Sequence, residues 1–145
     1  MIDDNGARAA RKSILYTATR LVFGAWFLFS GAEYFSPFDL QPLGHTPLAR
    51  EFTLALIHSG LFAIIKVVEV VVGALLLMNR AILPASLATV PLTAVIAYWN
   101  FVLDPGIVEY VFGTLTVIMN AFLLWPYRSE LLALLRWSNA IPSEN

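Results

Sequence analysis

Residues 61–78 read LFAIIKVVEVVVGALLLM, an apolar run of a length that spans a bilayer, and it contains two charged residues, Lys66 and Glu69. A charge at the bilayer centre costs about 2.5 to 3.5 kcal/mol, so charges inside such a run are informative. On a helix the spacing of three places both side chains on one face, where each lowers the cost of burying the other. The run therefore predicts a membrane helix with one polar face.

The composition extends this interpretation to the whole chain. Hydrophobic residues make up 59% and charged residues 13%, whereas about 25% of the residues in soluble domains are charged. We predict an all-α integral membrane four-helix bundle, a single domain over residues 1–145 with spans at about 14–35, 54–78, 82–103 and 107–125. A short amphipathic helix, Ser129 to Trp137, follows on the membrane surface.

The second span carries an alternative. Residues 48–58 could form a separate interfacial helix, with Ser59 and Gly60 as a break before the apolar run begins.

The orientation follows from the basic residues in short loops, because these stay on the cytoplasmic side. One side of the predicted membrane holds only Arg50; the other holds Arg8, Arg11, Lys12, Arg80, Arg128 and Arg136. We expect a multi-pass protein of the bacterial inner membrane with both termini in the cytoplasm.

Polar and small residues recur on one face of every predicted span, which favours a polar seam inside the bundle. The candidate site residues lie in two layers of this seam. The outer layer holds Lys66, Glu69, Asn100, Asp104 and Glu109, and the cytoplasmic layer holds Arg20, Ser86 and Asn120.

Two interpretations stay open for these residues. Lys66 and Glu69 form either a proton relay or ligand anchor, or a structural ion pair that fixes helix register. Arg20 either holds an anionic headgroup or partner, or reaches the cytoplasmic interface as a snorkelling side chain. We expect Asn100 and Asn120 to form interhelical hydrogen bonds, and Glu33 to be interfacial, outside the seam.

Other chemistry finds little support. The chain has no cysteine, which excludes disulfides, thiolate nucleophiles and covalently attached haem. His45 and His58 show no recognised ligand spacing, so we predict no metal site and solvated or interfacial histidines. A net charge of −1 gives no electrostatic support for nucleic-acid binding.

Several short segments together resemble the DoxX family. They are Phe27-Leu-Phe-Ser-Gly31, Ile65-Lys-Val-Val-Glu69, Gly73-Ala-Leu-Leu-Leu77, Asn100-Phe-Val-Leu-Asp104-Pro105, and Asn120-Ala-Phe-Leu-Leu-Trp125 with Tyr127-Arg128. The resemblance covers roughly residues 15–135 and implies a small four-helix protein of the bacterial inner membrane. Members of this family are often labelled oxidoreductases, and some are subunits of thiosulfate:quinone oxidoreductase.

Three functions remain in consideration. The first is an accessory subunit of a redox or quinone-linked membrane complex, which is not catalytic alone and has a quinone or a lipid as its non-covalent ligand. The second is a purely structural or assembly subunit, and the third, less favoured, is a small-molecule or proton transporter. The expected partners are membrane lipids and other membrane subunits or further copies of the chain.

Overall fold

The computed structural model describes residues 4–38 and 41–135, and all regular secondary structure within them is helical. The elements in chain order are α1 (Asp4–Glu33), α2 (Pro47–His58), α3 (Leu61–Leu77), α4 (Ile82–Tyr98), the π-helical turn η1 (Trp99–Leu103), α5 (Ile107–Leu124), the 3₁₀ turn η2 (Trp125–Tyr127) and α6 (Arg128–Leu135). The all-α prediction is confirmed.

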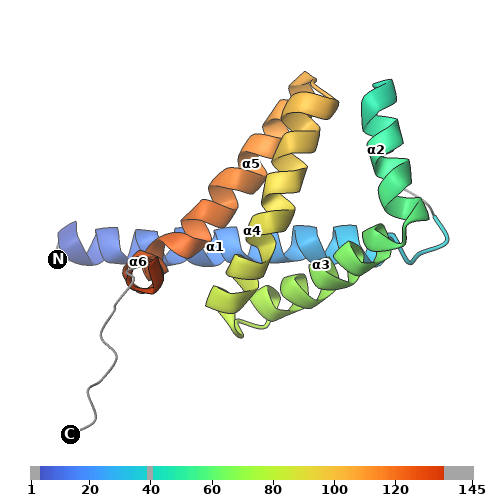
Figure 1. Ribbon diagram of the computed structural model, residues 1–145. Helices are drawn as coiled ribbons and strands as arrows, with labels where there is room; N and C mark the ends of the chain where they lie inside the picture. The colour runs from blue at the N-terminus through green and yellow to red at the C-terminus, as the bar shows by residue number, and fades with distance from the viewer. Residues whose placement is uncertain (1–3, 39–40, 136–145) are drawn as a thin grey trace, which may run out of the picture.

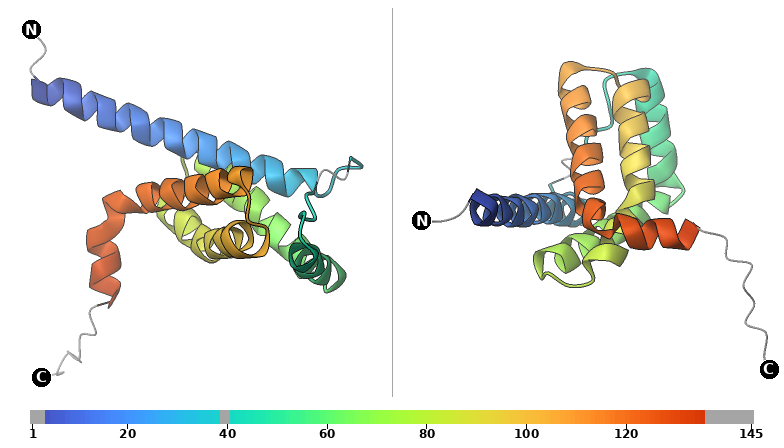
Figure 2. Two further views of the ribbon diagram at one scale, coloured as in Figure 1. Left: turned by 90° about the horizontal axis from the view of Figure 1, so that it is seen from above. Right: turned by 90° about the vertical axis from the view of Figure 1, so that its left-hand side faces the viewer.

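The helices pack as two pairs that cross each other. Helices α1 and α3 run side by side, and α4 and α5 rise together from them, while α2 stands beside this second pair (Figures 1 and 2). Small residues allow the close contact within the first pair. A Cβ atom on Gly73 would lie 2.4 Å from the backbone nitrogen of Leu28, and one on Gly31 would lie 2.6 Å from the carbonyl oxygen of Lys66.

The predicted second span is broken. Helix α2 ends at His58 and α3 begins at Leu61, and the two helices meet at an angle of 84°. Gly60 makes the turn with a φ of 76°, a left-handed conformation that is costly for residues with a Cβ. The single continuous span at 54–78 is therefore wrong, and the alternative of a separate helix before the break at Ser59 and Gly60 is confirmed.

Three helical segments are long and apolar enough to cross a membrane: Arg11–Glu33, Ile82–Leu103 and Ile107–Ala133. The number rises to four if the bent pair α2 and α3 counts as one span. By helix length and hydropathy, the chain is thus a small helical protein of the multi-pass membrane type.

A small apolar core joins the two helix pairs. Phe23 and Phe27 from α1 meet at a tilt, with 4.6 Å between ring centroids, and belong to one buried cluster with Leu76 of α3 and Leu123 of α5.

The C-terminal helix begins one residue earlier than expected, at Arg128, directly after η2. Arg136 and Trp137, which belong to the predicted orientation signal and to the predicted surface helix, lie outside the described residues.

Candidate functional site

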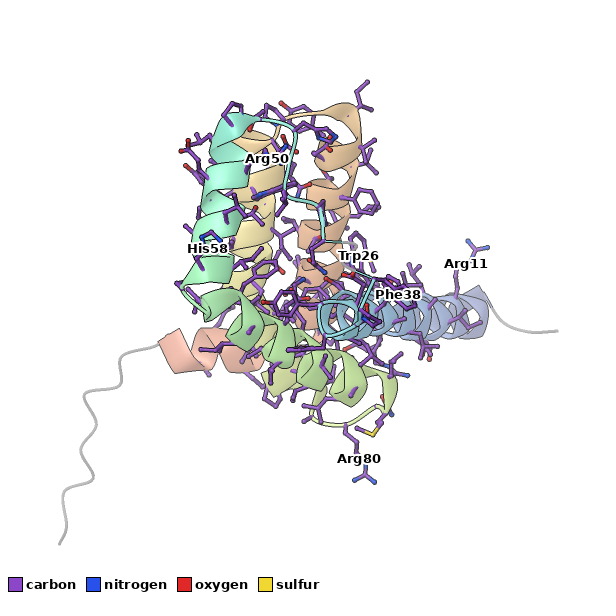
Figure 3. The ribbon with its side chains drawn as sticks, turned by 90° about the vertical axis from the view of Figure 1, so that its right-hand side faces the viewer. Arg11, Trp26, Phe38, Arg50, His58 and Arg80 are labelled. Atoms are coloured by element: carbon purple, nitrogen blue, oxygen red, sulfur yellow. The ribbon has the colours of Figure 1, made fainter. Side chains whose placement is uncertain are left out.

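A cavity of about 480 Å³ opens between the two helix pairs and α2. The five helices α1 to α5 and the turn η1 all contribute to its wall, as does the connection that precedes α2. Figure 3 shows Trp26 of α1 at the junction between α1 and α5, where it borders this space. Most of the wall is apolar and aromatic, as is typical of small-molecule sites.

The floor of the cavity carries the predicted ion pair. Lys66 Nζ donates to Glu69 Oε2 at 3.0 Å and to Ser30 Oγ of α1 at 2.9 Å, and both charged residues are buried. Lys66 Nζ also lies 5.0 Å from the centroid of the Phe62 ring, close enough for a cation–π interaction. An ammonium group has three N–H donors, so these two hydrogen bonds leave one donor for a ligand.

Glu33 lines the same cavity and is buried. Its carboxylate accepts a hydrogen bond from the side-chain amide of Gln41, which also donates to the carbonyl oxygen of Ser30 at 3.4 Å. The prediction that Glu33 lies outside the polar seam is therefore wrong. The reason is that the connection after α1 folds back over the end of this helix, a path that helical periodicity does not describe.

The π-helical turn η1 forms the upper wall. It brings Asn100 into the cavity, where the side-chain amide donates to the carbonyl oxygen of Ile96 at 2.7 Å. This bond lies within the continuous run of α4 and η1 and not between helices as expected. The neighbouring Trp99 donates from Nε1 to Thr53 Oγ1 of α2 at 3.1 Å, which ties α2 to the rest of the molecule. Turns of this type often occur at functional sites because they interrupt the regular helical register.

Asp104 anchors the connection before α2 to the end of η1. Its Oδ1 accepts the backbone N–H groups of His45 at 2.8 Å and Thr46 at 2.9 Å, while His45 Nδ1 lies 3.1 Å from Oδ2. Burial raises the pKa of the Asp104 carboxyl, but the hydrogen bonds from Thr46 and His45 outweigh burial, so this pKa lies below its ordinary value.

Glu109 completes this end of the site from the first turn of α5. Its Oε1 lies 3.7 Å from His45 Nδ1, and both side chains line the cavity. The structure thus brings together the predicted outer-layer residues Lys66, Glu69, Asn100 and Glu109, with Asp104 directly behind His45. Sequence reasoning missed His45 and Gln41. A usable signal existed, because their loop and the Asp104-Pro105-Gly106 turn fall on the same predicted side of the membrane.

Arg20 and Asn120 lie outside the cavity. The Arg20 guanidinium is buried and donates to the carbonyl oxygens of Leu76 and Leu77 at the C-terminal end of α3. Snorkelling is therefore the wrong expectation, since a helix end supplies the acceptors. The Asn120 side chain forms interhelical hydrogen bonds, as expected, with Nδ2 lying 2.5 Å from Thr89 Oγ1 and 2.9 Å from Thr93 Oγ1.

Comparisons with protein-family profiles, with curated proteins and with solved structures give no match to this chain. The fold and the cavity define its class: a small helical protein with three to four candidate membrane spans and a cavity that has a polar floor and aromatic walls.

Proposed function

We propose that the chain is a small accessory subunit of DoxX type in the bacterial inner membrane, and that its cavity holds the headgroup of a quinone for a redox partner. The observation that carries this proposal is the combination of an apolar, aromatic wall with one buried cation, Lys66, on the floor. A cavity of about 480 Å³ is in the range of small-molecule sites.

The chemistry of a quinone headgroup matches these walls. Its flat ring packs on aromatic side chains such as Trp26 and Phe112, which meet edge to face at 5.1 Å between ring centroids. Its carbonyl oxygens accept hydrogen bonds, and Lys66 keeps one N–H donor beyond those used by Glu69 and Ser30. Electron transfer belongs to the partner in this proposal, and the chain contributes binding and orientation.

Tryptophan fluorescence tests the proposal directly. Trp26 and Trp99 line the cavity, whereas Trp125 is 65% exposed and does not line it. Ubiquinone-1 added to the protein in mild detergent should quench the fluorescence saturably. The Trp26→Phe and Trp99→Phe variants should each lose part of the saturable signal, and the Trp125→Phe variant should retain all of it.

The role of Lys66 is tested in the same assay. Lys66→Met should weaken quinone binding at least about tenfold, the loss expected for one hydrogen bond to a charged donor. Arg80→Met is the matched control, because Arg80 points away from the molecule at the turn between α3 and α4 (Figure 3). Equal quenching of all tryptophan variants, or unchanged affinity after Lys66→Met, contradicts quinone binding at this cavity.

The second candidate is a structural subunit, and one observation favours it. Lys66 links α1 to α3 through Ser30 and Glu69, so the ion pair holds the chain's own helices together. Under this interpretation Lys66→Met lowers the stability of the protein in detergent, and ubiquinone-1 produces no saturable quenching in any variant.

The proposed orientation, with both termini cytoplasmic, has its own test. Because the chain contains no cysteine, single cysteines report without a background. In intact cells a membrane-impermeant thiol reagent should label Phe38→Cys from outside and should reach Arg80→Cys only after lysis. The reverse pattern contradicts the orientation.

A further inference from the structure

We infer that His45, Asp104 and Glu109 form a binding site for a divalent transition-metal ion such as Zn²⁺ at one end of the cavity. The three side chains come from a loop, from the end of η1 and from the first turn of α5, and their ligand atoms lie within 4.8 Å of one another. One imidazole nitrogen and two carboxylate oxygens are a donor set that suits zinc. This inference stands independently of quinone binding.

The distances fit metal coordination. Tetrahedral zinc with bonds of 2.0 to 2.2 Å places its ligand atoms about 3.4 Å apart. His45 Nδ1 lies 3.1 Å from Asp104 Oδ2 and 3.7 Å from Glu109 Oε1. Both separations are within a few tenths of an ångström of the required value.

Hydrogen bonds prepare Asp104 for this role. Its Oδ1 is held by the backbone N–H groups of His45 and Thr46, which leaves Oδ2 directed at the imidazole of His45. Such secondary contacts orient a carboxylate ligand and commonly strengthen metal binding. The Asp104 side chain is 2% exposed, so this ligand is fixed before an ion arrives.

Two glycines place the other ligands. Gly44 has a φ of 95°, a left-handed conformation that turns the chain so that His45 meets Asp104. The Glu109 carboxylate folds back over Gly106, where a Cβ atom would lie 2.1 Å from Glu109 Oε2. Residue 106 therefore must lack a side chain for Glu109 to take this position.

The local charge also favours a cation. Three carboxylates, those of Glu69, Asp104 and Glu109, lie at or directly behind the cavity wall. Lys66 is the one lysine or arginine among the described residues of that wall, and it pairs with Glu69. A divalent ion at His45 compensates part of this excess negative charge. Three protein ligands leave further coordination positions for water or for a ligand oxygen, as in zinc sites that bind substrates.

Calorimetry with protein that carries no polyhistidine tag tests the inference. After treatment with a chelator and its removal, the protein should bind one equivalent of Zn²⁺. His45→Ala and Glu109→Gln should each weaken binding at least about tenfold, because loss of even a residue that only orients a metal ligand costs about 10- to 100-fold. The His45 side chain is 87% exposed, so its removal leaves the fold intact.

His58→Ala is the matched control, because His58 is the second of the two histidines in the chain and lies on α2, outside this cluster (Figure 3). It should bind Zn²⁺ as the unmodified protein does. Co²⁺ supplies an independent readout, because the visible absorption of bound Co²⁺ depends on its ligands. The spectrum of Co²⁺ with the unmodified protein should therefore differ from its spectrum with His45→Ala.

Two results would overturn the inference. One is Zn²⁺ binding that is unaffected by His45→Ala or equally reduced by His58→Ala. The other is the absence of saturable Zn²⁺ binding to the unmodified protein.

Discussion

Replacing Gly73 with alanine tests the crossing of α1 and α3. A Cβ atom at this position would lie 2.4 Å from the backbone nitrogen of Leu28 and 2.7 Å from the carbonyl oxygen of Gly24. Both are main-chain atoms, so no side-chain rotation relieves the overlap. Because ordinary contacts are about 3.5 Å, the two helices must separate by about 1 Å.

The expected loss in the free energy of unfolding is the packing cost minus the gain in helix propensity. Overpacking of this kind costs about 1 to 3 kcal/mol, and each ångström of separation also weakens the contacts of Phe23 and Phe27 with Leu76 in the core. The higher helix propensity of alanine returns up to about 1 kcal/mol. We expect Gly73→Ala to lower the free energy of unfolding by about 2 kcal/mol.

Gly24→Ala is the matched control, since it changes the same residue type at the same crossing. Its Cβ would lie 3.0 Å from Leu76 Cβ and 3.2 Å from the carbonyl oxygen of Gly73, so shifts of a few tenths of an ångström accommodate it. Its expected effect is within about 0.5 kcal/mol. Unfolding by dodecyl sulfate in mixed micelles, followed by far-ultraviolet circular dichroism, measures both. Equal losses, or a larger loss for Gly24→Ala, would refute this account of the crossing.

Three further predictions concern the polar contacts. Arg20→Met should cost about 1.5 to 3 kcal/mol in the same unfolding assay, because the end of α3 loses its charged donor, and ubiquinone-1 affinity should not change. Asn120→Leu should lower the free energy of unfolding by about 1 kcal/mol, because two interhelical hydrogen bonds at about 0.6 kcal/mol each are lost. An unchanged free energy of unfolding would contradict a stabilising role for these bonds. The pKa of Asp104 is lowered in the folded protein, so its stabilising contribution is present above the ordinary pKa and is lost as the pH falls through the lowered value. With a chelator present, the hydrogen-exchange protection of the His45 and Thr46 amides should decrease below about pH 4, and Asp104→Asn should lack this decrease.

Helical periodicity accounts for much of what the sequence predicted. A separation of four residues places Thr89 and Thr93 on one face of α4, and it places Thr116 and Asn120 on one face of α5. All four residues are buried. The same reasoning places Lys66 and Glu69 side by side, where the structure shows a 3.0 Å ion pair. Within one apolar helix, the face with polar side chains must turn toward protein, so these burials follow from local sequence.

Contacts made by irregular segments did not follow in this way. His45 meets Asp104 across 59 positions of the chain, next to the left-handed turn at Gly44. Glu33 reaches the cavity because Gln41 folds back onto it. The partner of Arg20 was missed for a related reason: a side chain that is expected to reach water can instead find carbonyl oxygens at the end of a neighbouring helix.

The Arg20 contact has a consequence for how the chain is made. Its acceptors, the carbonyl oxygens of Leu76 and Leu77, are translated 56 and 57 residues after the arginine itself. The first helix therefore leaves the ribosome and enters the membrane with a guanidinium that has no internal partner, at a cost of up to about 3 kcal/mol. Only a nascent chain long enough to fold α3 back against α1 removes this cost. Chains whose synthesis stops before Leu76 should consequently be the ones that membrane quality-control proteases clear fastest.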